Sequence, residues 1–283
     1  MTPLQITLTV LGGIFLLLAV LYLLALRTNR RRRATALFTT YNYTHRGLFG
    51  GDIPENSLAA FALSCEAGYG IELDVALSRD GVPVVFHDAT LTRMCGVDGK
   101  ISDYTAEELS KMKLNGREGH TIPTFREVLA LVGGRVPLIV EFKVDAGEKP
   151  DPLCEAAMKL LDVYTGDFCV ESFNPFAVRW FRKNRPLLVR GQLSDVFHKS
   201  KKKPSVGQRI VEAFLLNFLC RPDFLAFNFR YPYHPPFALA RFFYRPVTVA
   251  WTPRSDEEVT EALAHFDAVI FESANPPQRN ESK

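Results

Sequence analysis

The chain begins with a long apolar stretch that no charge interrupts. Residues 4–26 consist mainly of Leu, Val, Ile, Phe and Ala, and a helix of that length can cross about 30 Å of hydrocarbon. Five arginines follow at once, whereas no Lys or Arg precedes the stretch: Arg27, Arg30, Arg31, Arg32 and Arg33. A cleavable signal peptide normally carries its charge before the apolar core. We therefore expect a transmembrane anchor over residues 1–33; the alternatives are a signal peptide or a buried core helix.

After a short linker at 34–41, strand-like and helix-like patterns alternate to the end of the chain. The predicted strands are 43–46, 70–77, 83–87, 137–143, 168–173, 188–193, 224–228, 247–252 and 268–271. The predicted helices are 57–67, 106–112, 124–131, 152–163, 175–184, 207–219 and 256–265. About eight such units in about 240 residues are typical of a TIM-type (β/α)₈ barrel, which we place at 42–276 with a polar tail at 277–283.

The strand count exceeds the eight places of such a barrel by one. The segment Arg79-Asp80-Gly81 between the second and third strands is a tight turn, too short for a crossover helix. We therefore expect one strand of that pair to be antiparallel or to lie outside the barrel. The alternative architecture is an open doubly wound sheet, but no G-x-G-x-x-G motif follows the first strand.

Net charge and cysteine usage narrow the functional classes. The formal charge is +3, but without the five arginines 29 basic residues face 31 acidic ones. Nucleic-acid binding needs a distributed basic surface and is therefore not expected. The arginines should meet anionic lipid headgroups and keep the following domain on the cytoplasmic side of the cell (inner) membrane, as a single-pass protein. Five scattered cysteines without a C-x-x-C pair indicate reduced thiols rather than disulfides or a zinc site.

Polar residues end several of the apolar strands, where a barrel carries its functional groups. They are His45 and Arg46, Glu72 and Asp74, His87 and Asp88, Glu141 and Lys143, Glu171 and Ser172, and Trp251. Glu72 and Asp74 are two residues apart in a strand and so share a face. With Glu141 they would repel one another unless a cation neutralises them, and oxygen ligands favour Mg²⁺, Ca²⁺ or Mn²⁺ over zinc. The alternative is that Glu141 pairs with Lys143 and the other two carboxylates are solvated.

The two histidines suit proton transfer. His45 and His87 have ordinary pKa values near neutrality, so together they supply an acid and a base. Arg46 would face away from His45 in an extended strand, and it reaches a bound phosphate only if the strand ends or bulges there, as Gly47 permits. Lys143 is a second candidate phosphate contact, with a structural ion pair as the alternative.

Two further residues complete the candidate site. Glu55 lies in a loop that turns into a helix, with Asn56 or Ser57 as the N-cap. Capping does not require Glu55, which we expect to support the metal or its water from behind. Trp251 is expected to line the pocket or to belong to the core.

At these positions the chain resembles the glycerophosphodiester phosphodiesterase family. The matching motifs are His-Arg-Gly at 45–47, Pro-Glu-Asn-Ser at 54–57, Glu-x-Asp-Val at 72–75, Asp-Gly-x-Pro-Val-Val at 80–85 and His-Asp at 87–88. Later matches are Glu-x-Lys at 141–143, Ser-Phe at 172–173 and Trp-Thr at 251–252. The resemblance covers roughly residues 42 to 276. One departure is Glu272, where the family usually has the Asp of a Thr-Asp-x-Pro pattern; we assign it no catalytic role.

The resemblance implies hydrolysis of a glycerophosphodiester to sn-glycerol 3-phosphate and an alcohol. By analogy with the family, one divalent cation, Mg²⁺ or Ca²⁺, would be held by Glu72, Asp74 and Glu141. His45 and His87 would be the acid/base pair, and Arg46 would contact the phosphate. The substrate's own 2-hydroxyl would attack phosphorus, and water would then open the resulting cyclic phosphate.

Substrate and membrane contacts leave alternatives open. Lys199, Lys201, Lys202 and Lys203 precede an apolar stretch at 210–219 and an aromatic-rich segment at 224–243. This is either an ordinary barrel helix after a solvated loop or a surface that lies on the membrane. In the second case the substrate would be a lysophospholipid, cleaved by a lysophospholipase D-type activity. A lyase that stops at the cyclic phosphate and a non-catalytic lipid-binding scaffold are further alternatives; no obligatory protein partner is evident.

Overall fold

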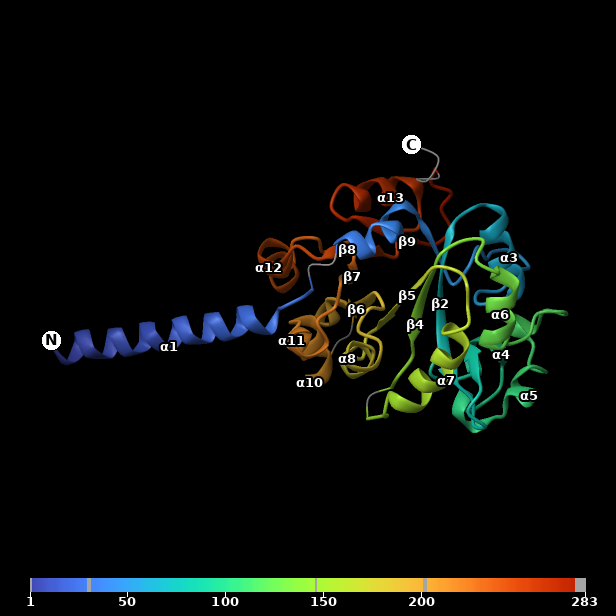
Figure 1. The fold of residues 1–283 in the computed structure, drawn as a ribbon, viewed down its shortest axis with the longest axis horizontal. Helices are drawn as coiled ribbons and strands as arrows, with labels where there is room; N and C mark the ends of the chain where they lie inside the picture. The colour runs from blue at the N-terminus through green and yellow to red at the C-terminus, as the bar shows by residue number, and fades with distance from the viewer. Residues whose placement is uncertain (1, 30–31, 146, 201–202, 278–283) are drawn as a thin grey trace.

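Eight parallel strands close into a barrel in the described part of the chain (Figure 1). The computed structural model describes residues 2–29, 32–145, 147–200 and 203–277. The barrel strands are β1 (Tyr43–His45), β2 (Gly70–Leu77), β4 (Leu138–Phe142), β5 (Phe168–Ser172), β6 (Arg190–Ser194), β7 (Phe224–Asn228), β8 (Val247–Trp251) and β9 (Ala268–Phe271). Parallel pairing of β1 with both β2 and β9 closes the ring. The predicted TIM-type barrel is confirmed, and the open sheet is wrong.

The ninth strand lies outside the ring. β3 (Pro83–Val85) pairs antiparallel with β2 through the tight turn at residues 79–81, as the short connection requires. It opens an excursion at residues 78–124, between β2 and the next barrel helix. This excursion also contains α4 (Thr92–Cys95), η2 (Ile101–Asp103), α5 (Ala106–Leu109) and η3 (Leu114–Gly116). Most buried apolar side chains of the excursion form a cluster of their own, whereas Val85 of β3 belongs to the cluster between the barrel and its helices.

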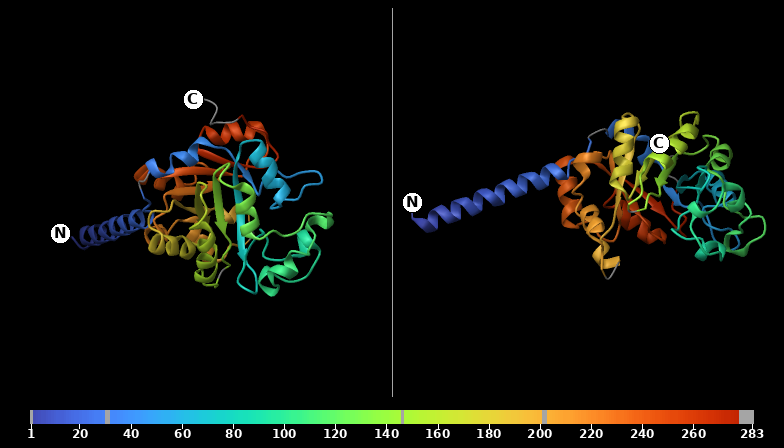
Figure 2. Two further views of the ribbon diagram at one scale, coloured as in Figure 1. Left: turned by 45° about the vertical axis from the view of Figure 1, so that its right-hand side comes forward. Right: turned by 90° about the horizontal axis from the view of Figure 1, so that it is seen from below.

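Helices connect the strands and cover the outside of the barrel (Figures 1 and 2). They are α3 (Leu58–Glu66), α6 (Phe125–Val132), α7 (Asp151–Leu161), α8 (Pro175–Asn184), α9 (Phe197–Ser200), α10 (Val206–Glu212), α11 (Asn217–Cys220), α12 (Pro235–Tyr244) and α13 (Asp256–Leu263). α6 shows why such segments are helical: a Thr124–Glu127 capping box begins it, and Gly133 at φ 54° ends it. Its apolar side packs on α3 and the sheet.

Two helical predictions were wrong in detail. The predicted helix at 207–219 is divided into α10 and α11, because Phe214 takes a left-handed conformation at φ 53°. α12 was missed within the aromatic-rich segment, although Pro235 and Pro236 at its first turn are a typical helix start. The segment is therefore mostly a barrel strand and helix.

Side chains alternate between two environments along each barrel strand. On β2, Ile71, Leu73 and Val75 face the layer of helices, so the residues between them face the barrel interior. Near the N-terminal ends of the strands that interior is apolar and includes Tyr43 and Ile139. Toward the C-terminal ends it is acidic. All five cysteines are free, as the sequence indicates.

The N-terminal helix α1 (Pro3–Ala25) extends from the side of the barrel as a long rod, and only its C-terminal end contacts the barrel (Figures 1 and 2). None of its residues is buried, and it is long and apolar enough to cross a membrane. The chain then contacts the barrel. Leu26 is fully buried in the apolar layer between the barrel strands and their covering helices. Next come α2 (Arg32–Thr35) and η1 (Leu37–Thr40), in the segment expected to be a linker. Phe38 packs against the apolar residues of the barrel interior.

Several residues named in the sequence predictions lie outside the described residues. They are Arg30 and Arg31 of the arginine cluster, Lys201 and Lys202 of the lysine run, and residues 278–283 of the polar tail.

Candidate functional site

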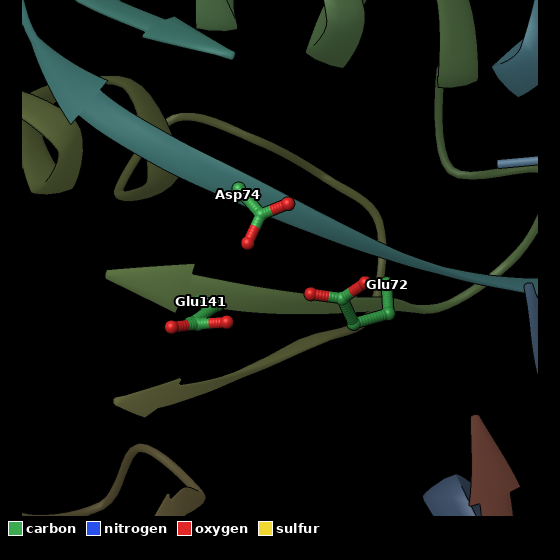
Figure 3. Close-up of side chains that lie close together, drawn as sticks. All are labelled: Glu72, Asp74 and Glu141. Carbon is green, nitrogen blue, oxygen red and sulfur yellow. The ribbon is translucent and has the colours of Figure 1, made fainter. Parts of the chain in front are cut away.

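Three acidic side chains converge at the C-terminal end of the barrel interior (Figure 3). Glu72 and Asp74 come from β2 and Glu141 from β4, and strand pairing sets Asp74 opposite Glu141. One carboxylate oxygen from each lies within 4.8 Å of the others, and all three residues are buried. The predicted same-face arrangement is therefore present. Closely spaced carboxylates buried together are compatible with a divalent metal site.

Burial and mutual proximity disfavour the charged forms of two of these carboxylates. Burial and the nearby Asp74 hold the pKa of Glu72 well above its usual value. Burial also raises the pKa of Glu141 to about 7, although Lys143 opposes the shift. Burial likewise opposes the charge on Asp74, but Lys143 and His87 hold the pKa of its carboxyl well below its usual range. The site thus concentrates more negative charge than a buried environment readily accepts.

Lys143 and Arg46 offset part of that charge. Lys143 Nζ lies 2.9 Å from Glu141 Oε1 and 3.1 Å from Asp74 Oδ1. The ion pair considered as an alternative for Lys143 therefore exists, and it exists inside the acidic cluster rather than in place of it. Two cations against three carboxylates leave a net negative charge, and the donors are hard oxygens. Glu72, Asp74 and Glu141 therefore fit a divalent cation.

Arg46 reaches the site through a local backbone turn. β1 ends at His45, and Arg46 takes a left-handed conformation at φ 59°, followed by Gly47 at φ 84°. The turn brings the guanidinium to the acidic side, with Nε 3.4 Å from Asp74 Oδ2. It is the break in the strand on which the predicted phosphate contact depended.

Each of the two histidines has a carboxylate partner. His45 Nδ1 lies 3.1 Å from Glu272 Oε2, and His87 Nδ1 lies 2.7 Å from Asp88 Oδ1. An ionised carboxylate only accepts hydrogen bonds, so each Nδ1 carries the proton and Nε2 is left as the basic nitrogen. Burial lowers the pKa of both imidazoles, to about 4 for His87. Both lie close enough to Asp74 to lower the pKa of its carboxyl.

A chain of ion pairs joins the two halves of the site. Glu55 accepts from Arg46 at 2.7 Å and from Arg93 at 2.6 Å. Arg93 in turn donates its Nε to Asp88 at 2.5 Å, and Asp88 holds His87. Glu55 thus supports Arg46, rather than reaching the carboxylate cluster by itself. The network ties the excursion that carries His87 to the loop that follows β1.

Three of these contacts were not foreseen in the sequence. Asn56 donates to Asp74 Oδ2 at 2.8 Å, whereas Ser57 alone caps α3. Because Ser57 already suffices as the cap, the spare amide of Asn56 was a usable signal. Glu272 stands at the end of β9, the position that the barrel rule marks, but its partner lies 227 residues away. Arg93 lies in the excursion, where no strand periodicity pointed to it.

A cavity of about 460 Å³ opens beside the cluster, at the C-terminal ends of β2, β4 and β5. His87, Glu141, Lys143 and Phe173 are among its lining residues. Trp251 is not among them; its ring contacts Phe173 edge-on, with centroids 5.7 Å apart. Trp251 is partly buried and packs against the apolar cluster of the barrel interior. Of the acidic cluster, Glu141 lines the cavity, so a small polar molecule in it would contact that carboxylate.

Comparisons with known proteins point to one family. The model of the glycerophosphoryl diester phosphodiesterase family matches residues 45–271. A glycerophosphodiester phosphodiesterase of Caldanaerobacter subterraneus subsp. tengcongensis is 35% identical over 158 residues, 53% of this chain and 64% of the relative. One from Bacillus altitudinis is 38% identical over 112 residues, 36% of this chain and 44% of the relative. The matched segments thus span less than two thirds of either relative.

Solved structures extend the likeness over the barrel. A phosphodiesterase of Oleispira antarctica, solved in complex with the product sn-glycerol-3-phosphate, superposes with a TM-score of 0.68 at 26% identity. The superposition covers 88% of this chain and 98% of the other. A glycerophosphodiester phosphodiesterase of Thermotoga maritima gives 0.61 at 26% identity, covering 82% and 93%. Because the family model matches most of the chain, from residue 45 to residue 271, the chain belongs to the glycerophosphoryl diester phosphodiesterase family.

Proposed function

We propose that this protein hydrolyses glycerophosphodiesters to sn-glycerol 3-phosphate and an alcohol, with one divalent cation, Mg²⁺ or Ca²⁺. The observation that carries the proposal is the joint geometry at the barrel mouth. A buried three-carboxylate cluster, an arginine turned toward it and two carboxylate-partnered imidazoles meet there. His87, Glu141 and Lys143 of this group line a cavity. Such groups match the needs of phosphodiester cleavage: charge neutralisation, phosphate binding and proton transfer.

The two imidazoles would move the protons of the reaction. One would accept, through Nε2, the proton of the substrate's glycerol 2-hydroxyl as that oxygen attacks phosphorus. The other would donate a proton to the departing alcohol oxygen, leaving a cyclic phosphate. Water would then open the ring with the proton roles exchanged. Because the nucleophile belongs to the substrate, proximity lowers the barrier and no protein nucleophile is needed.

The remaining residues would bind and neutralise. Arg46 and Lys143 would contact the phosphate oxygens, while Glu55 holds Arg46 in place. Glu272 and Asp88 would stabilise each imidazole when it is protonated. A cation bound by Glu72, Asp74 and Glu141 supplies positive charge against the charge that grows on the phosphate oxygens.

Product analysis tests this function directly. Purified full-length protein is incubated with glycerophosphocholine and Mg²⁺ or Ca²⁺, and the products are followed by ³¹P NMR. We expect glycerol 3-phosphate as the final phosphorus-containing product. Accumulation of the cyclic phosphate alone would identify a lyase, and no turnover on a panel of glycerophosphodiesters and lysophospholipids would leave a non-catalytic scaffold. Turnover confined to lysophospholipids would identify the lysophospholipase D-type activity.

We further propose that α1 is a retained membrane anchor rather than a cleaved leader. The contacts at its C-terminal end support this. Tyr244 donates to the Leu23 carbonyl at 2.6 Å, and Leu26 is fully buried in the barrel layer. Asn29 donates to Asp223 at 3.0 Å. Removing the segment would therefore break these contacts with the folded barrel. A cleaved signal peptide is not expected to make such contacts with the mature protein.

The proposed orientation predicts where the C-terminus lies. Because five arginines follow α1 directly, the barrel should remain in the cytoplasm. A fluorescent or enzymatic reporter that works only in the cytoplasm, fused after Lys283, should be active. A reporter that works only outside the cell membrane should be silent in the same fusion. The reverse pattern would overturn the orientation.

A further inference from the structure

Three arginines gather where α1 meets the barrel, far from the candidate site. Arg27 follows the last turn of α1, Arg182 lies near the end of α8, and Arg221 follows α11 directly. Arg182 donates to the carbonyls of Phe218 and Leu219 at 2.9 and 2.6 Å, which fixes it against the end of α11. No ion pair joins any of the three to a carboxylate of the described residues.

Arg221 makes this cluster unusual. It ends α11 at φ 41°, a left-handed position that Gly or Asn adopts at lower steric cost than Arg. Its buried Nε has no hydrogen-bond partner in the described part of the chain. Burial together with the charges of Arg27 and Arg182 lowers the pKa of its guanidinium. The nearby Asp223 is already engaged by Asn29 and by the Arg190 backbone N–H. Among the described residues, no hydrogen bond or ion pair of the Arg221 side chain explains why an arginine stands here.

The depth of α1 in a membrane places this cluster at the headgroup layer. At about 1.5 Å per residue, the 23 residues of α1 span slightly more than the roughly 30 Å of a bilayer core. Tyr22 donates to the Ala213 carbonyl and Tyr244 to that of Leu23, so the barrel is held against the last turn of the helix. Exposed aromatic rings flank the contact: Phe218 is 44% exposed on α11 and Phe242 is 75% exposed on α12. Aromatic residues favour this depth.

We infer that Arg27, Arg182 and Arg221 form a binding site for the phosphate of an anionic phospholipid, beside α1 on the barrel side of the membrane. A lipid with a net negative headgroup would neutralise cations that have no carboxylate partner, while Phe218 and Phe242 enter the interface around it. A zwitterionic lipid carries its own cation and would bind less well. The barrel would thereby be fixed in one orientation on the membrane surface. This inference rests on the proposed retention of α1 and not on the proposed catalysis.

Lipid selectivity of the full chain tests the inference. Wild-type protein in phosphatidylcholine nanodiscs receives trace spin-labelled phosphatidylglycerol or phosphatidylcholine, and electron paramagnetic resonance measures the immobilised fraction of each. We expect a preference for phosphatidylglycerol. Arg221→Asn should reduce the preference about fivefold, the scale of one arginine near a lipid surface. Because Asn suits the left-handed position, its Tm should not fall. Arg182→Gln should show a similar loss of preference.

The matched control is Arg126→Gln, which makes the same charge change on α6, across the barrel from α1 (Figure 1). It should leave the preference unchanged. An undiminished preference in Arg221→Asn, an equal loss in Arg126→Gln, or full displacement of the labelled lipid by millimolar inorganic phosphate would overturn the site. Release of wild-type protein from membranes by alkaline carbonate would overturn the anchor and the inference with it. None of these outcomes would alter the expected hydrolysis of a soluble diester.

Discussion

Replacing His87 by alanine should lower the turnover of glycerophosphocholine by about a hundredfold or more, and His45→Ala should do the same. Acid/base catalysis by one positioned side chain contributes on that scale. Truncating either histidine should leave the apolar core intact, because the hydrogen-bond partner of each ring is a carboxylate. kcat and KM for glycerophosphocholine measure the effect, and the loss should fall mainly on kcat.

His120→Ala is the matched control. His120 lies in the same excursion as His87, and its side chain makes no hydrogen bond or ion pair with any described residue, so activity should be unchanged. In the double variant of His45 and His87, the fold-loss in kcat should be far smaller than the product of the two single losses. The reason is that the two residues act in one proton-transfer sequence. Retention of more than a tenth of wild-type kcat by either single variant, with Tm unchanged, would contradict the proposed acid/base pair.

Removing divalent cations with EDTA should abolish activity, and Mg²⁺ or Ca²⁺ should restore it. The same addition should raise the Tm of the wild-type protein, since binding to the folded state alone at 100 times Kd adds about 2.7 kcal/mol. In Glu72→Gln and Asp74→Asn the rise in Tm and the activity should both disappear. Without added cation, Glu72→Gln should be at least as stable as wild type, because it removes a carboxylate that burial and neighbouring charge disfavour.

Glu155→Gln on α7 controls for the loss of one negative charge. Glu155 is exposed on the outside of the barrel, so this variant should keep both the activity and the metal-dependent rise in Tm. A wild-type Tm that does not respond to either cation, together with full activity in EDTA, would show that Lys143 and Arg46 alone neutralise the carboxylates.

The barrel could be predicted because its strands carry local signals. Most barrel strands are short apolar runs, although β6 (Arg190–Ser194) is largely polar. The turn at Arg79-Asp80-Gly81 was enough to predict that one strand of its pair would be antiparallel or lie outside the ring. Glu72 and Asp74 were placed on one face by strand periodicity alone. Glu141 then followed from the barrel rule, which brings the ends of neighbouring strands together. These features depend on a few adjacent residues and on topology.

The contacts that orient the site depend on tertiary structure and could not be predicted in the same way. Glu272 reaches His45 only because β9 closes the ring against β1. Arg93 reaches Glu55 across 38 residues, through an excursion without periodic signals. Phe214 divides a helix that the apolar pattern joins, since backbone conformation at one residue leaves no periodic trace. Burial, which lowers the pKa of both histidines, is likewise a property of the assembled fold.

The apolar cluster of the excursion at residues 78–124 affects the order in which parts of the molecule unfold. Among the described residues it rests on eight buried side chains, far fewer than the cluster between the barrel and its helices. Such a unit should open at lower free energy than the barrel and carry His87 with it. On heating, catalytic activity should therefore be lost at a temperature at which the barrel is still folded. Hydrogen exchange should show residues 78–124 losing protection before β4 and β5, and simultaneous exchange of both would show a single cooperative unit.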